Sequence, residues 1–143
     1  MTQKSTLSKE KREDSGFEVL DRDLITRILG TVVYDKAFFF YADIAQPTGD
    51  YAVSLVDLCN KMNTTVPKSL AFHLKRRDFE KWIREVIGDS ELADRIDKLK
   101  KLKTTWKNDK TTRRKLCAAV ENRVTELQEL WRHALTWPES VVA

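Results

Sequence analysis

Apolar residues recur every three or four positions along most of the chain, which is the spacing of the buried face of an amphipathic helix. The first such stretch follows a capping-box sequence at 15–18 and stops at Gly30, so it predicts a helix over about 16–29. A second stretch predicts a helix over about 52–62 from four apolar positions: Leu55, Leu58, Cys59 and Met62.

The chain after position 66 predicts four more helices. Pro67 suits the first position of the next helix, and Asp78 is expected to cap the one after it, which Gly88 ends. Two long helices follow, each with one apolar stripe: Leu92, Ile96, Leu99, Leu102 and Trp106, then Leu116, Val120, Val124, Leu127, Trp131 and Leu135. Because only a short turn at 107–109 separates them, they are predicted to form an antiparallel hairpin that ends near Trp137.

The aromatic segment over 34–45 gives conflicting signals. Its run of aromatic residues at 38–41 favours a strand by propensity. No other segment offers a convincing partner strand, however, and a lone strand is not stable. A buried helix is therefore the preferred interpretation, and residues 46–50, with Pro47 and Gly49, predict a loop. The aromatic group is expected in the core; exposed, it would mark a partner or ligand groove.

Together these elements predict an all-α fold, a single-domain bundle of five to seven helices with a long C-terminal antiparallel helical hairpin. The helical domain is expected over 16–137, with a mobile polar tail at 1–15 and a C-terminal tail at 138–143. Four Gly and three Pro in 143 residues fall well below the average usage of roughly 12% for the two together. Turns are therefore few, which argues against a sandwich or barrel of many strands.

The remaining composition narrows the classes of protein. Hydrophobic residues make up 41% and charged residues 34%, as in a globular domain. No apolar run approaches the roughly 18 residues that cross a bilayer, and the N-terminal residues lack the apolar part of a secretory signal. A cytoplasmic protein with no membrane partner is expected.

The sequence carries no signature of a cofactor or metal. The common nucleotide-binding and hydrolase motifs are absent, and two Cys with two His at these spacings do not form a zinc site, so no cofactor and no metal are predicted. Cys59 lies on an apolar helix face and is expected to act as a small hydrophobe. Cys117 lies near Arg113, Arg114 and Lys115, cations that lower a thiol pKa, but a structural thiol is the preferred interpretation. Both thiols are expected to stay reduced.

A family resemblance rests on the segment FHxxRxDFxxWI at 72–83, with further matches including AFFFY at 37–41, PTG at 47–49 and RRKL at 113–116. With these residues the chain resembles, over about 37–130, a family of uncharacterised prokaryotic, largely archaeal, helical domains of unknown function. The resemblance implies a structural motif: Phe72, His73, Arg76, Asp78, Phe79 and Trp82. It also implies that glycine is frequent where this chain has Arg77, and it implies no activity.

The positive charge of the chain is concentrated in one segment. The net charge is +4, but residues 98–115 hold nine basic side chains and one acid, so the rest of the chain sums to −4. The nine are Lys98, Lys100, Lys101, Lys103, Lys107, Lys110, Arg113, Arg114 and Lys115. Like charges at helical spacing repel one another. This basic segment lies at the tip of the predicted hairpin, and we expect nearby acids or a polyanionic partner to offset the repulsion.

Three functions follow from this segment and its surroundings. The leading hypothesis is a non-enzymatic module that binds nucleic acid or a ribonucleoprotein electrostatically through 98–115. The alternative is a protein–protein adaptor, with homodimerisation possible, in which the basic segment pairs with an acidic protein surface. A plain solvated helix face also fits the pattern.

The third function uses the one cluster with the composition of a small active site. His73 with Asp78 and Arg76 offers a general base and an orienting carboxylate for an enzyme or a ligand-binding domain. A structural role is the preferred interpretation, in which Asp78 caps a helix and His73 bonds across the helix break. No catalytic residue is therefore predicted, and an exposed His73 in a concave pocket is what catalysis would require.

Overall fold

The computed structural model describes residues 21–100 and 109–135, and within them the fold is mostly helical. Helix α2 (Arg22–Leu29) comes first, followed by a 3-10 turn (Tyr34–Lys36) and the strands β1 (Phe38–Asp43) and β2 (Gln46–Ala52). Helices α3 (Leu55–Thr64), α4 (Pro67–Arg76) and α5 (Asp78–Trp82) follow. A π-helical turn (Ile83–Ile87) then leads to α6 (Ser90–Lys100) and the long helix α7 (Asp109–Leu135).

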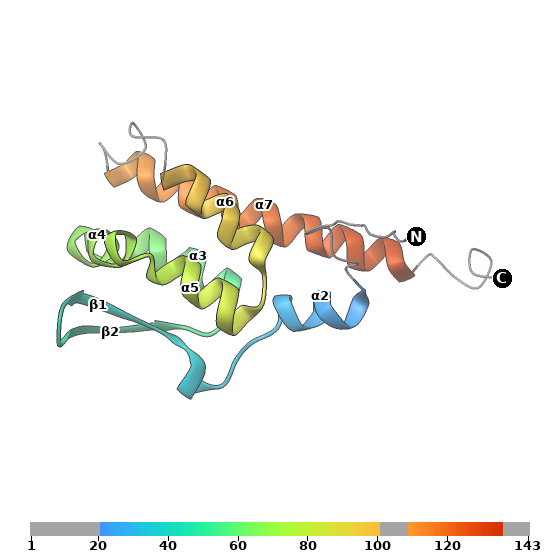
Figure 1. Cartoon of the computed structure of the whole chain (residues 1–143), viewed down its shortest axis with the longest axis horizontal. Coiled ribbons are helices and arrows are strands. Elements are labelled where there is room, and N and C mark those ends of the chain that lie inside the picture. Colours follow the sequence, from blue (N-terminus) through green and yellow to red (C-terminus); the bar gives the residue numbers. More distant parts are fainter. Residues whose placement is uncertain (1–20, 101–108, 136–143) are drawn as a thin grey trace, which may run out of the picture.

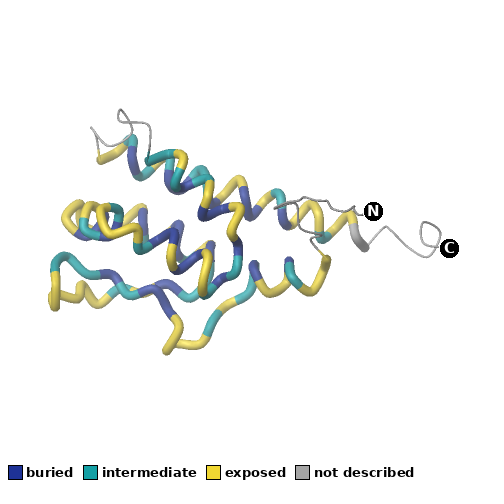
Figure 2. Tube along the Cα trace, viewed as in Figure 1, coloured by how far each residue is buried: buried dark blue, intermediate teal, exposed yellow. Residues whose placement is uncertain are grey.

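These elements form three layers (Figure 1). The β1–β2 hairpin lies on one side, α3, α4 and α5 form the middle layer, and α6 with α7 covers the far side. Helix α2 packs against α7 beyond the end of the sheet. Buried positions gather between the layers, and the outer side of the hairpin is exposed (Figure 2).

Most of the predicted helices are confirmed, with their ends set by local chemistry. Helix α3 begins at Leu55 rather than near 52, because the Ser54 side chain accepts a hydrogen bond from the Asp57 N–H and so caps it. Pro67 is the first residue of α4, as predicted. Gly88, at φ 91°, ends the helical segment that starts at Asp78.

The prediction for 34–45 was wrong, because this segment contains a 3-10 turn and strand β1 instead of a buried helix. The partner strand is the following segment, predicted as a loop, which pairs antiparallel with β1 and places Pro47 opposite Tyr41. Two register irregularities and Gly49 at φ 94° let this Pro- and Gly-containing strand pair. The fold is therefore not purely all-α.

The hairpin is stable because its inner face is part of the core. Phe38 and Phe40 point inward and are 4% and 0% exposed. Phe38 stacks on Phe79 of α5 with ring centroids 5.0 Å apart. A two-stranded sheet is only marginally stable by itself, so packing against α3, α4 and α5 provides the stabilisation that a third strand would otherwise give.

Helix α7 joins the layers through its apolar stripe. The predicted positions Leu116, Val120, Val124 and Leu127 are buried, as are Leu92 and Ile96 of α6. A buried ion pair adds a polar connection, since the Arg123 guanidinium donates to both Asp89 carboxylate oxygens at 2.8 and 3.0 Å. The segment that joins α6 to α7 lies outside the described residues, as do the predicted tails at 1–15 and 138–143, so the predicted hairpin turn is not part of the described structure. None of the described helices is both long and apolar enough to span a membrane.

Candidate functional site

The predicted basic segment begins and ends on described helices. Lys98 and Lys100 lie in the last turn of α6, and Lys110, Arg113, Arg114 and Lys115 lie in the first two turns of α7. These two helix ends are adjacent at one end of the molecule (Figure 1), where Lys100 and Asp109 line the same cavity. The other three predicted cations, Lys101, Lys103 and Lys107, lie outside the described residues.

Lys100 is bound into the interior. Its Nζ donates a hydrogen bond to the Leu74 carbonyl in the last turn of α4, and it lies 3.4 Å from Oε2 of Glu80. Glu80 is buried, and burial raises the pKa of this carboxyl, which the Lys100 charge opposes. Lys100 therefore ties α6 to α4 and α5.

Arg113 has a similar structural position. Its Nε donates to Asp109 at 2.7 Å, and its Nη1 donates to the Met62 carbonyl at 2.9 Å near the end of α3. The side chain is largely buried, so this guanidinium fixes the first turns of α7 against α3. Lys100 and Arg113 thus fix the described ends of the basic segment to the body of the protein, and their charges are already engaged by protein groups.

Four of the predicted cations remain available at the surface. Lys98, Lys110 and Arg114 are exposed, and Lys115 is partly exposed. None of the four pairs with an acidic residue in the described part of the chain. We refer to these four residues as the basic end.

The segment FHxxRxDFxxWI forms the helix break between α4 and α5. Arg77 adopts the left-handed conformation there, at φ 62° and ψ 31°. Asp78 is the first residue of α5 and makes no capping bond, so the prediction that it caps the helix was wrong. Its carboxylate Oδ2 instead lies 2.8 Å from His73 Nδ1 and accepts from Arg76 Nε at 3.1 Å.

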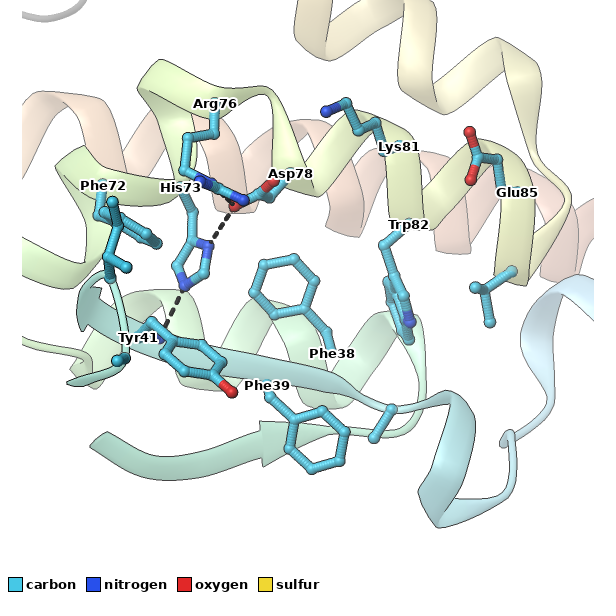
Figure 3. Close-up of a pocket in the computed structure, with 14 residues that line it drawn as sticks. Phe38, Phe39, Tyr41, Phe72, His73, Arg76, Asp78, Lys81, Trp82 and Glu85 are labelled. Atoms are coloured by element: carbon cyan, nitrogen blue, oxygen red, sulfur yellow. Dashed lines mark hydrogen bonds and ion pairs between the residues drawn. The ribbon is translucent and has the colours of Figure 1, made fainter. Parts of the chain in front are cut away.

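His73 connects this break to the sheet (Figure 3). Its Nε2 accepts a hydrogen bond from the Tyr41 N–H on β1 at 2.8 Å, so Nδ1 carries the proton that Asp78 accepts. The ring is 2% exposed. Burial lowers the pKa of His73 below its ordinary value, although Asp78 opposes the shift.

This geometry gives His73 a structural role. A general base needs a free ring nitrogen within reach of substrate, and both nitrogens of His73 are bonded to the protein. The imidazole instead satisfies a main-chain N–H at the edge of β1, which would otherwise lack a partner. The structure brings together the three residues that the sequence suggested, His73, Arg76 and Asp78. Their role is structural, because they link β1 to the helix break between α4 and α5; we call this cluster the brace.

An aromatic groove lies beside this brace (Figure 3). Its volume is about 480 Å³, within the range of ligand pockets. Its aromatic lining comes from β1, α4 and α5: Phe38, Phe39, Tyr41, Phe72, His73 and Trp82. The Trp82 Nε1–H donates to the Lys36 carbonyl at 2.7 Å and so holds one wall in place. Arg76, Lys81 and Glu85 supply charge at the groove.

The aromatic character extends onto the outer face of the hairpin. Tyr34 makes edge contacts with Phe39 and Tyr51 at centroid distances of 5.2 and 5.1 Å. Tyr34 is 61% exposed, and Ile44 at the hairpin turn is 75% exposed. We call Tyr34, Phe39, Tyr41, Ile44 and Tyr51 the aromatic surface.

Sequence reasoning missed this surface because it assigned the aromatic run to a buried helix. The alternation of Phe38 and Phe40 inward with Phe39 and Tyr41 outward is concealed by four adjacent aromatic residues. Tyr51, which lies opposite Phe39 on β2, is the signal that could have revealed the pair of strands. Among the described residues, no group of three or more His, Cys, Asp or Glu side chains is arranged to hold a metal ion.

Comparison with protein-family models, curated proteins and solved structures finds no match for this chain. The resemblance to the archaeal helical family therefore stays a prediction.

Proposed function

We propose that this protein is a non-enzymatic interaction module that binds nucleic acid, free or within a ribonucleoprotein, through its basic end. The observation that carries the proposal is the set of cations on the adjacent ends of α6 and α7 that no described acid neutralises: Lys98, Lys110, Arg114 and Lys115. Elsewhere in the described chain, arginines such as Arg84, Arg95 and Arg123 have carboxylate partners.

The framework below the basic end supports this role. Lys100 and Arg113 hold the ends of α6 and α7 on α4, α5 and α3, so the exposed cations project from a fixed support. Holding like charges close together costs free energy, which phosphates of a bound strand would recover. Lys101, Lys103 and Lys107, placed by the sequence between the two helices, would add to the same charge.

The mode of binding follows from the residue types. Lysine and arginine on the surface contact phosphates and do not by themselves read bases. Four phosphate contacts would make the affinity fall by about a hundredfold between 50 and 200 mM salt. We therefore expect binding with weak dependence on sequence and strong dependence on ionic strength.

A charge-reversal experiment tests the proposal. Lys98, Lys110 and Arg114 are changed together to Glu, and fluorescence anisotropy is measured with labelled RNA and DNA of mixed sequence. The matched control reverses Lys36, Arg84 and Arg132, three exposed cations outside the basic end, so both variants have the same net charge. Lys100 and Arg113 are left unchanged, because their loss would disturb the fold.

The proposal expects the basic-end variant to lose binding while the control keeps most of it. Equal losses in the two variants would attribute binding to net charge alone and contradict a role for the basic end. Circular dichroism of both variants establishes that they remain folded.

A protein–protein adaptor is the second candidate, favoured by the aromatic surface. Exposed clustered aromatic rings beside a groove are typical of surfaces that accept an apolar anchor from a partner. Arg76 and Lys81 at the groove suit an acidic residue beside that anchor. This candidate expects a complex that survives 200 mM salt, unlike the phosphate contacts above, and that is lost when Tyr34 and Tyr51 are changed to Ser.

A further inference from the structure

The two cysteines, far apart in sequence, meet at the contact between α3 and α7. Cys59 and Cys117 are 58 positions apart, and both are buried, at 4% and 5% exposure. The Cys117 thiol donates to the Cys59 carbonyl at 3.2 Å. The Cys59 thiol lies 3.8 Å from the Cys117 carbonyl in the reciprocal contact.

This reciprocal contact brings the two main chains close together. Each sulfur lies against the backbone of the other cysteine, so both side chains point across the same helix interface. A disulfide requires Cα atoms within about 4.4–6.8 Å and side chains directed at each other. Each sulfur lies 3.2 or 3.8 Å from the other cysteine's carbonyl oxygen, so a rotation about the Cα–Cβ bonds is the movement by which the two sulfurs would meet.

We infer that Cys59 and Cys117 are a redox modification site, at which a peroxide such as hydrogen peroxide converts the buried thiol pair into a disulfide between α3 and α7. This site is independent of what the basic end binds. The two thiols form a pair, where the sequence predicted two separate structural thiols.

The two thiols affect each other's ionisation. A side-chain hydrogen bond between them lowers the pKa of Cys117 and raises the pKa of Cys59, while burial raises the pKa of both. One sulfur of the pair therefore ionises while the other keeps its proton, which is what attack by a thiolate followed by resolution requires.

The reaction balances with one peroxide and no other reactant. The thiolate of one cysteine attacks one peroxide oxygen, the O–O bond breaks, and the leaving hydroxide takes up a proton to become water. That cysteine is then a sulfenic acid. The sulfur of the other cysteine attacks the sulfenic acid sulfur, the S–O bond breaks, and a second water leaves with the proton of the second thiol. Two thiols are oxidised, and one peroxide is reduced to two waters.

The structure also offers a route for a small oxidant. A groove of about 480 Å³ runs along the α3–α7 contact, and Cys59, Val56, Asn60, Val120 and Glu121 line it. Hydrogen peroxide is about as large as two water molecules, so the groove admits it, whereas bulky disulfides are expected to react slowly.

The disulfide would reinforce the support of the basic end. Cys117 lies one helical turn from Arg113, whose guanidinium bonds to the Met62 carbonyl on α3. Closing a loop of this length restricts the unfolded chain, so we expect the melting temperature to rise by roughly 10 °C on oxidation.

The test uses the full-length protein treated with hydrogen peroxide, quenched, and alkylated under denaturing conditions. The expected result is a mass lower by two hydrogens, no alkylated cysteine, and a peptide containing both Cys59 and Cys117 in a non-reducing digest. Dithiothreitol should restore both thiols and the original melting temperature.

Single variants test whether both thiols are required. In Cys59→Ser and in Cys117→Ser the remaining thiol has no resolving partner, so neither variant should form the internal link, and oxidation should stop at sulfenic or sulfinic acid. The inference is overturned if the oxidised wild-type protein still alkylates at both cysteines, cross-links between molecules, or gains oxygen without the internal link. The wild-type digest decides the matter even if a variant fails to fold.

Discussion

At the scale of single residues, Arg77 is one of two non-glycine residues, with Ala45, that have a positive φ in the described part of the chain. It joins α4 to α5 at φ 62°, in the left-handed region. A residue with a Cβ pays about 1–2 kcal/mol for this conformation, and glycine does not.

Replacing Arg77 by Gly is therefore expected to stabilise the protein. The ion pair with Asp97, at 3.7 Å on a mostly exposed side chain, contributes little. We expect the free energy of unfolding in urea to increase by about 0.5–1 kcal/mol for Arg77→Gly. Arg77→Ala, which loses the same ion pair but keeps the strained backbone, should show no gain. A less stable glycine variant would contradict the assignment of strain to Arg77.

His73 links stability to pH at the same scale. Its pKa is lowered in the fold by burial, so the unfolded chain, with an imidazole pKa near 6.5, binds more protons just below that pH. Its contribution to stability is complete above about pH 6.5 and is lost as the pH falls toward the folded-state pKa.

A pH series of urea unfolding checks this assignment. The wild-type protein should lose stability as the pH falls below about 6.5, and His73→Gln, which can still accept from the Tyr41 N–H, should lose less. An identical pH dependence in both proteins would show that other groups, such as the buried Glu80, control it.

At the scale of elements, the sequence predicted helices well and the hairpin badly, for identifiable reasons. Each helix has an apolar stripe of period 3.6 that its environment then buries, as in Leu116 to Leu127 of α7. The hairpin lacks the matching strand signal, because adjacent aromatic residues in β1 hide the alternation and Pro47 with Gly49 in β2 indicate a loop. Its stability comes from packing on α3, α4 and α5, which no local pattern contains.

In the candidate site, too, the sequence predicted what depends on neighbouring residues and missed what depends on tertiary packing. The sequence brought His73, Arg76 and Asp78 together because they flank one helix break. The groove beside them could not be predicted, because its walls come from β1 as well as α4 and α5. For the cations, charge counting identified the segment but could not distinguish Lys100 and Arg113, which bond to protein groups, from the exposed members.

The attachment of α6 to α7 depends on the buried pair of Asp89 and Arg123. Removing one member of a buried ion pair costs about 3–5 kcal/mol, because the other charge stays buried. Because Arg123 also donates to Glu126 at 3.2 Å, its charge keeps one carboxylate partner when Asp89 is removed. Asp89→Ala should therefore lower the free energy of unfolding by about 3 kcal/mol, at the lower end of this range.

Two further variants test that interpretation. Asp89→Ala with Arg123→Met leaves no unpaired charge and should cost less than the sum of the single changes. Asp94→Ala breaks the exposed pair with Arg84 and should cost less than about 1 kcal/mol. If Asp89→Ala is as mild as Asp94→Ala in urea unfolding, the buried pair does not hold α6 on α7.

At the scale of the whole molecule, the basic end and the aromatic surface lie in different parts of the structure. The basic end lies where α6 ends and α7 begins, in the layer farthest from the hairpin, while the aromatic surface covers the outer side of the hairpin (Figure 1). Apart from the basic segment the chain is acidic overall, at −4 against +8 for residues 98–115. A polyanion would thus be attracted to one end and repelled by the remainder, which favours one orientation of binding.

The most direct test of the proposed function is the salt dependence of nucleic-acid binding by the wild-type protein. The dissociation constant for a labelled RNA or DNA of mixed sequence is measured by anisotropy in steps from 50 to 200 mM salt. Four or more phosphate contacts predict a linear double-logarithmic plot and a loss of affinity of about a hundredfold or more over this range. Absence of binding at 50 mM, or an affinity that salt leaves unchanged, would contradict the account and direct attention to a protein partner at the aromatic surface.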